Sequence, residues 1–180
     1  MNTHRIHWLS LSFLLALGFP TVAAEGPARF EVGGLTFERP QGWGWVEQRG
    51  AMRQAQMEVK AEGVEGSAEV VFFHFGPGNG GGTKANIDRW LGQFAEPRDQ
   101  LKHKVEEETV GGRKVTYVQA EGTYQSGMPG GPKTPLKDHA LIGAIIEGAQ
   151  GHVFVRMTGP SGLAKASIDP FKKMVMSGLK

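Results

Sequence analysis

The chain contains no cysteine among its 180 residues. This absence excludes disulfide bonds, a thiol nucleophile and a cysteine-linked lipid. The fold must therefore be held together by its hydrophobic core alone. A chain of about the size of one ordinary domain can bury enough surface to form such a core.

An excess of charge of one sign is also lacking, because 20 basic residues face 18 acidic ones and the formal net charge is +2. The basic pairs Lys102/Lys104 and Lys172/Lys173 are small, and acidic residues are interleaved among the basic ones along the chain. A protein that binds polyanions normally presents a clustered basic face. We therefore expect no nucleic-acid partner.

Long hydrophobic runs are absent apart from residues 8–19. This run is shorter than the roughly 20 residues that cross a bilayer. Arg5 precedes it, and Pro20 and a small-residue segment follow it, which is the layout of a secretory signal peptide. We place cleavage after Ala24, so that residues 1–24 form the signal peptide and residues 25–180 a single α+β domain. The mature protein is then expected in the periplasm or outside the cell, with no stable membrane anchor.

Recognisable catalytic and metal-binding motifs are missing as well. Beyond the expected signal peptide the histidines are His74, His103, His139 and His152, and no two have the close spacing of a metal-ligand pair. The G-x-S-x-G elbow of serine hydrolases is also absent. We therefore assign no catalytic residue and no metal site.

The sequence does contain a series of strand-like segments. Residues 68–75 (AEVVFFHF) are apolar at both odd and even positions, which indicates a central strand covered on both faces. Residues 53–59 alternate apolar and polar side chains, which indicates a strand with one solvated face. Further strands are expected in a hairpin over 30–37, in a second hairpin joining 104–110 to 113–124, and at 139–147 and 152–158.

Two helices are expected. Residues 83–94 carry an apolar stripe at i, i+3, i+4 and i+7, which predicts a helix that covers one face of the sheet. The stripe consists of Ile87, Trp90, Leu91 and Phe94. Asp169-Pro170 has the pattern of an N-cap followed by proline at the first helical position, so we expect the closing helix to begin there.

Residues 125–138 contain three prolines and three glycines, and we expect no regular element there. Irregular stretches of this length are uncommon in compact domains and tend to be either mobile or functional. The stretch is therefore a candidate recognition surface, with simple disorder as the alternative.

The glycine-rich segment 76–81 (GPGNGG) formally matches G-x-G-x-x-G between an expected strand and an expected helix. The dinucleotide-binding fingerprint lies in a parallel βαβ unit, whereas the hairpins here indicate an antiparallel sheet. Thr83-Lys84 also reverses the residue order of the Walker motif. We interpret the segment as a tight turn and expect no nucleotide or other cofactor.

Strands joined by short turns, together with two helices and doubly apolar strands, predict an antiparallel sheet with helices packed on both faces. The P-x-G-W turn at Pro40, Gly42 and Trp43 follows the opening hairpin, and a strand, a G-P step and a helix close the chain over residues 153–177. This layout resembles the PsbP/DcrB-type fold of exported bacterial and chloroplast-lumen domains. The resemblance implies a PsbP-like α/β/α sandwich and a non-catalytic envelope module.

The polar residues Asn86, Arg89 and Gln93 share a stripe beside the apolar stripe of the first helix. A guanidinium between two amides suits recognition of a carboxylate, a sugar or a peptide backbone. We therefore name these three residues as a candidate binding surface, with a solvated helix shoulder as the alternative.

Two classes of function remain. The first is a non-catalytic exported binding or accessory module whose partner is an envelope protein or a glycan. The second is a secreted enzyme, hydrolase-like, whose site is assembled from separate strands. A concave polar pocket lined by Arg89, Arg156, His74 or His152 with perturbed carboxylates would favour the enzyme, and a fully covered sheet would favour the module.

Overall fold

The computed structural model describes residues 26–47, 52–127 and 130–180. The expected signal peptide, residues 1–24, lies outside the described residues. The strands are β1 (Arg29–Val32), β2 (Leu35–Glu38), β3 (Gly44–Trp45), β4 (Arg53–Val59), β5 (Ala68–His74), β6 (Lys102–Val110), β7 (Arg113–Ser126), β8 (Thr134–Ile146) and β9 (Val153–Pro160). The helices are α1 (Thr83–Leu91), α2 (Ser161–Ala166) and α3 (Ile168–Ser177).

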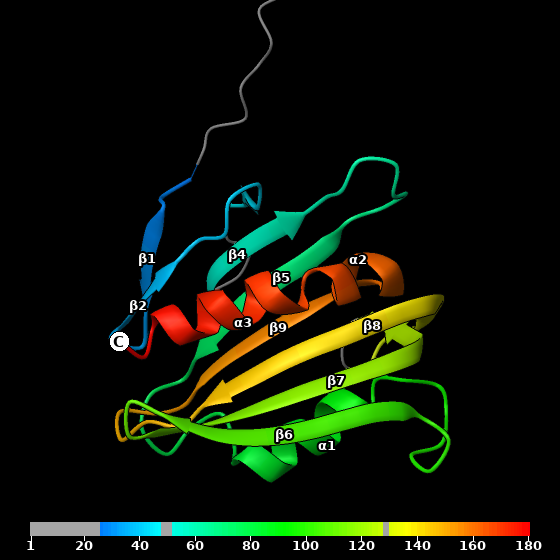
Figure 1. Ribbon diagram of the computed structural model, residues 1–180. Helices are drawn as coiled ribbons and strands as arrows, with labels where there is room; N and C mark the ends of the chain where they lie inside the picture. Colours follow the sequence, from blue (N-terminus) through cyan, green and yellow to red (C-terminus); the bar gives the residue numbers. More distant parts are fainter. Residues whose placement is uncertain (1–25, 48–51, 128–129) are drawn as a thin grey trace, which may run out of the picture.

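Seven of these strands form one antiparallel sheet in the order β3-β4-β5-β9-β8-β7-β6. The predicted opening hairpin is present, with Val32 paired to Leu35 across Gly33-Gly34, but β1 and β2 form a separate two-stranded sheet. Helices α2 and α3 lie in front of the large sheet and α1 lies behind it (Figure 1). The α+β class with helices on both faces is therefore confirmed.

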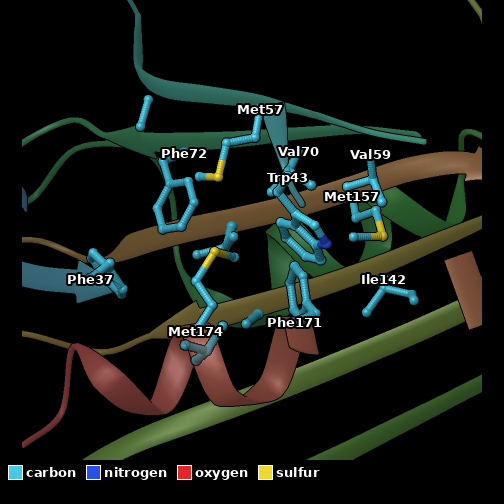
Figure 2. Packing of buried hydrophobic residues seen from close by; sticks show 14 of the residues in the cluster. Phe37, Trp43, Met57, Val59, Val70, Phe72, Ile142, Met157, Phe171 and Met174 are labelled. Carbon is cyan, nitrogen blue, oxygen red and sulfur yellow. The ribbon is translucent and has the colours of Figure 1, made fainter. Parts of the chain in front are cut away.

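One face of the sheet is covered by α2, α3 and the β1–β2 hairpin. Phe72 from the sheet meets Phe30 and Phe37 of the hairpin, each with its ring centroid 5.0 Å away. Phe171 and Met174 rise from α3 toward the sheet (Figure 2), and both are buried. We call this the α3 face, and its aromatic and aliphatic side chains form the larger of the two cores.

The opposite face, which we call the α1 face, carries the smaller core. Trp90 and Leu91 are buried there, as the apolar stripe predicted, and Phe94 packs with them although α1 has already ended. A Cβ atom at Gly143, in the middle of β8, would lie 2.2 Å from the Trp90 ring. Glycine at this position therefore lets the indole lie directly on the sheet.

The expectation of no regular element at residues 125–138 is wrong at both ends of the stretch. β7 continues to Ser126 and β8 begins at Thr134, with Gln125 paired to Pro135. Proline lacks a backbone N–H, but it is tolerated where a strand begins, and Pro135 is the second residue of β8. Gly127 has φ 135° and Gly130 has φ 75°, and both lie between the end of β7 and the start of β8.

The closing helix also begins earlier than predicted. β9 runs on through Gly159 and Pro160, and α2 starts at the next residue. Ser167 separates α2 from α3, and its hydroxyl donates a hydrogen bond to the Leu163 carbonyl over 2.9 Å. Asp169 is therefore not the N-cap but lies in the first turn of α3, where its charge suits the positive end of the helix.

Candidate functional site

Helix α1 covers only part of its face of the sheet. It packs over β7 and β8 and against Phe154 of β9, while the β4–β5 end of the same face carries polar side chains. A cavity of about 560 Å³ lies over this end. It is lined by Val46, Arg53, Gln56, Met57, Glu58, Ser67, Glu69, Tyr124, Ser126, Leu136, His139, Thr158 and Gly159. We refer to this cavity as the polar pocket.

A β-bulge forms one wall of the polar pocket. Gly122 pairs with His139 and Tyr124 pairs with Leu136, so β8 has one residue more than β7 in this interval. The extra length is taken up by Asp138, which adopts φ 53°, a left-handed conformation that aspartate tolerates better than most residues. Bulges bend a strand and redirect its side chains. This bulge places Tyr124 and Leu136 on the wall of the pocket.

The bent part of β7 is held by the segment that follows α1. The Ala95 N–H donates to the Thr123 carbonyl over 2.9 Å, and the Gln125 N–H donates to the Gln93 carbonyl over 2.7 Å. The Glu96 carboxylate accepts from the Thr123 N–H at 2.8 and 3.0 Å. The wall is therefore held by backbone hydrogen bonds to the segment that follows α1, as well as by β8.

The floor of the polar pocket is a cluster of three side chains that are joined to one another by hydrogen bonds. Arg53 Nη1 donates to Glu69 Oε1 over 2.6 Å and to Gln56 Oε1 over 2.9 Å. Gln56 Nε2 closes the ring by donating to Glu69 Oε1 over 2.9 Å. Because each side chain restrains the other two, the polar atoms are held in place before any ligand arrives.

A second carboxylate lies beside the cluster. Glu58 is paired directly with Glu69 across β4 and β5, and like charges in such pairs are destabilising. Lys60 Nζ lies 2.9 Å from Glu58 Oε2. The hydrogen bond from Lys60, and then one from Ser67, holds the pKa of the Glu58 carboxyl below its ordinary value. Each carboxylate therefore has its own cation, Arg53 for Glu69 and Lys60 for Glu58.

Glu58 is not suited to act as a general acid, but the sheet is not fully covered either, which was the condition that favoured the module. A carboxyl that acts as a general acid near neutral pH needs a raised pKa, whereas the pKa of Glu58 is lowered. The lining residues do not include Arg89, Arg156, His74 or His152, the side chains that would have favoured an enzyme.

The candidate surface residues of α1 do not share one exposed row. Asn86 is fully buried, and its Nδ2 donates to the Gly80 carbonyl over 2.9 Å and to the Gly82 carbonyl over 3.0 Å. Arg89 is exposed, and its Nη2 donates to Asn86 Oδ1. Asn86 therefore ties the glycine-rich loop to α1, and only Arg89 of this pair faces solvent.

Gln93, the third candidate, reaches toward the polar pocket instead. Its Oε1 accepts from Tyr124 Oη over 3.3 Å and from Arg156 Nη1 over 3.2 Å. Tyr124 lines the pocket, so Gln93 supports the pocket wall from behind.

Sequence reasoning missed the Arg53–Gln56–Glu69 cluster because its members lie on two strands. The alternation in residues 53–59 did indicate a solvated face, which is the face that lines the pocket. The pairing of Gln56 with Val71, which brings Glu69 within reach, depends on a register that neither strand encodes alone.

The other motifs lead to no further site. Thr83 Oγ1, at the start of α1, donates to Glu147 Oε1 over 2.7 Å, so a carboxylate already lies beside this helix end. The glycine-rich loop has positive φ at Gly76, Gly78, Gly80 and Gly81, as a tight turn requires. Within the described ranges, no group of three or more histidine or acidic side chains could hold a metal ion.

A membrane-crossing helix would have to be long and continuously apolar, and none of the described helices meets both conditions.

Comparison with known proteins identifies the fold. No family model and no curated protein matches the sequence. The solution structure of cyanobacterial PsbP (CyanoP) from Synechocystis sp. PCC 6803 is similar, with a TM-score of 0.54 and 11% identity over 84% of this chain and 92% of that one. The crystal structure of a protein of unknown function from Pseudomonas aeruginosa gives a TM-score of 0.46 and 14% identity over 83% and 93% of the two chains. The chain therefore has a PsbP-like α+β fold.

Proposed function

We propose that this protein is a non-catalytic binding module exported to the cell envelope, and that the polar pocket receives its ligand. The observation that carries the proposal is the uncovered part of the α1 face, where charged side chains line a cavity and neutralise one another. A sheet face without a ligand role would be expected to carry a covering helix or scattered solvated side chains.

The pocket has the properties of a ligand site. Its volume of about 560 Å³ falls in the range of about 300–1,000 Å³ that is usual for small-molecule sites. The ring of hydrogen bonds among Arg53, Gln56 and Glu69 fixes their rotamers in advance, so little side-chain entropy is lost on binding.

Export is part of the proposal and rests on the expected signal peptide. The expected cleavage site after Ala24 precedes the contacts that Gly26 and Pro27 make with the rest of the domain. Trp45 packs against Gly26, and Arg39 donates to the carbonyls of Gly26 over 3.0 Å and Pro27 over 3.1 Å. Cleavage after Ala24 would leave these contacts intact. Mass spectrometry of protein from the native host should therefore find a chain that begins near Glu25.

Arg89 belongs to the proposal as the exposed member of the α1 row. It lies on α1, on the α1 face of the sheet, and its contact with Asn86 orients it. A protein partner that binds across the α1 face would meet this guanidinium. Asn86 and Gln93 would act beneath the surface, through the glycine-rich loop and through Tyr124.

Nuclear magnetic resonance of the ¹⁵N-labelled mature chain tests the pocket directly. Solubilised envelope of the native host should shift the amide signals of Gln56, Ser126 and Thr158, which line the pocket. The signals of Gly111 and Gly112, in the turn at the other end of β7, should stay in place. Shifts confined to surfaces away from the pocket, or no shifts, would contradict the proposal.

A pair of variants separates binding from folding. Arg53→Ala should remove the shifts, whereas Lys173→Ala, an exposed change on α3, should preserve them. Thermal melts of both variants establish that the fold is retained.

A further inference from the structure

We infer that the ligand of the polar pocket is a neutral saccharide, and this inference rests on the proposed binding function. Four features of the pocket select this class: its charge balance, the positions of its uncommitted donors and acceptors, its apolar surface, and its place on the sheet.

The charge balance disfavours ionic ligands. Arg53 and Lys60 face Glu58 and Glu69, so the formal charges cancel. An anionic ligand such as a phosphate would have to displace Glu69 from Arg53 and would meet Glu58 nearby. A cationic ligand would have to compete with two cations already in place. A neutral ligand meets neither obstacle, because it leaves both ion pairs intact.

The uncommitted polar atoms match hydroxyl groups. Both described hydrogen bonds of the Arg53 side chain leave from Nη1, and both of those that Glu69 accepts end on Oε1. Among the described residues, Arg53 Nη2 and Glu69 Oε2 therefore have no hydrogen-bond partner. A sugar hydroxyl both donates and accepts, so it can bond to the carboxylate and the guanidinium together. Thr158 and Ser126 add hydroxyls to the lining.

The pocket also offers apolar surface. Val46 and Leu136 are half-buried and line it, and the Val46 N–H donates to the Gln56 carbonyl over 3.0 Å, so Val46 lies beside the polar floor. A sugar ring presents C–H groups on its faces and hydroxyls at its edge, and a pocket with both kinds of lining matches that division.

The position of the pocket disfavours a peptide strand. Extended peptides usually bind by adding a strand to an open sheet edge, where main-chain hydrogen bonds supply the affinity. The polar pocket lies over the face of β4, β5 and β9, and the backbone of β5 is already paired on both sides. A ligand over this face therefore cannot add a strand to β5, which favours a compact polyhydroxyl ligand over an extended peptide.

An array of immobilised oligosaccharides tests the inference. Neutral tetramers of the maltose, cellulose, chitin and mannan types are printed beside sialylated and sulfated glycans. The mature protein should bind neutral glycans and leave the acidic ones unoccupied. Glu69→Gln keeps the shape of the side chain but removes its charge, and it should weaken binding roughly tenfold to a hundredfold, as expected for a hydrogen bond to a charged group. Lys173→Ala should bind as the wild type does.

The outcomes separate this inference from the binding function itself. Absence of binding to every neutral glycan, binding to acidic glycans only, or binding that Glu69→Gln leaves unchanged would overturn the saccharide assignment. If envelope extract still shifts the pocket amides in that case, the module stands and its ligand is a protein or another envelope component. If neither the array nor the extract engages the pocket, both proposals fail.

Discussion

The two faces of the central sheet differ in how completely they are covered. On the α3 face, two helices and a β-hairpin enclose a continuous core that includes Phe72 and Phe171. On the α1 face, a single nine-residue helix covers one end and leaves the polar pocket at the other. The first face accounts for most of the buried apolar side chains, and the second holds the polar site.

This difference separates the stabilising core from the polar pocket on one sheet. Apolar burial on the α3 face stabilises the fold in proportion to the area removed from water. The polar end of the α1 face can then carry partly exposed charges whose pairing contributes little to stability. Variants on the two faces should therefore have different consequences.

The largest effect is expected from Phe171→Ala on the α3 face. Phe171 is fully buried beneath the sheet, so its removal should lower the unfolding free energy by about 3 to 5 kcal/mol. Urea denaturation measures the change. The adjacent exposed substitution Lys173→Ala should stay within about 0.5 kcal/mol of the wild type. Equal effects of the two variants would show that the α3 face is not the main core.

A smaller effect is expected from Gly143→Ala, which tests the covered part of the α1 face. The new methyl group would lie 2.2 Å from the Trp90 ring, so α1 must lift from the sheet, at a cost of about 1 to 3 kcal/mol. Hydrogen exchange should become faster in α1 and stay unchanged in α3. Unchanged exchange in α1 would mean that the indole can move aside without the helix.

Alkaline pH should lower the unfolding free energy through Tyr117, which belongs to the core of the α3 face. Burial, and then the nearby Glu108 carboxylate, raises the pKa of the Tyr117 phenol above its ordinary value of 10.0. The unfolded chain therefore loses this proton first, and stability should fall as the pH rises above about 10. The hydroxyl has no hydrogen-bond partner of standard geometry among the described residues.

Tyr117→Phe provides the control for that titration. It should match the wild type at neutral pH, because no hydrogen bond is lost, and it should unfold less readily than the wild type above pH of about 10. If both proteins lose the same stability over this pH range, the loss comes from a group other than Tyr117, such as a lysine.

The smallest effect on stability is expected from Arg53→Ala in the polar pocket. The Arg53 side chain is 30% exposed and Glu69 is 39% exposed, and partly exposed ion pairs contribute less than about 1 kcal/mol. Thermal melts should therefore change little while ligand binding is lost. A loss above about 2 kcal/mol would instead identify the cluster as a structural anchor.

Much of the fold could be predicted because the strands follow from the local pattern of apolar and polar side chains and the turns from glycine pairs. The double apolar pattern of residues 68–75 correctly indicated a central strand, of which Val70, Val71 and Phe72 are buried. Glycine pairs marked the first two hairpins. The β7–β8 hairpin was missed because proline and glycine dominate residues 125–138, whereas pairing between the flanking strands overrides the weak local preference.

The site was harder to predict because it depends on the arrangement of several strands. Asn86, Arg89 and Gln93 were grouped by helical spacing, but α1 ends at Leu91, before Gln93. Asn86 bonds to the glycine-rich loop, whereas Gln93 bonds to Tyr124. Arg53 and Glu69 are separated in sequence and join only when β4 and β5 pair in the observed register. The bulge at Asp138, which bends the pocket wall, has no strong sequence signal.

The place of β9 has a consequence for how the protein is made. β9 is the last strand of the chain, yet it lies between β5 and β8, and it joins Glu69 to Thr158. Pairings between residues so distant in sequence slow folding, because a long loop must close before they form. The sheet cannot be completed until almost the whole chain has emerged. A chain threaded across a membrane from its amino terminus would thus stay unfolded during transit and fold on the far side.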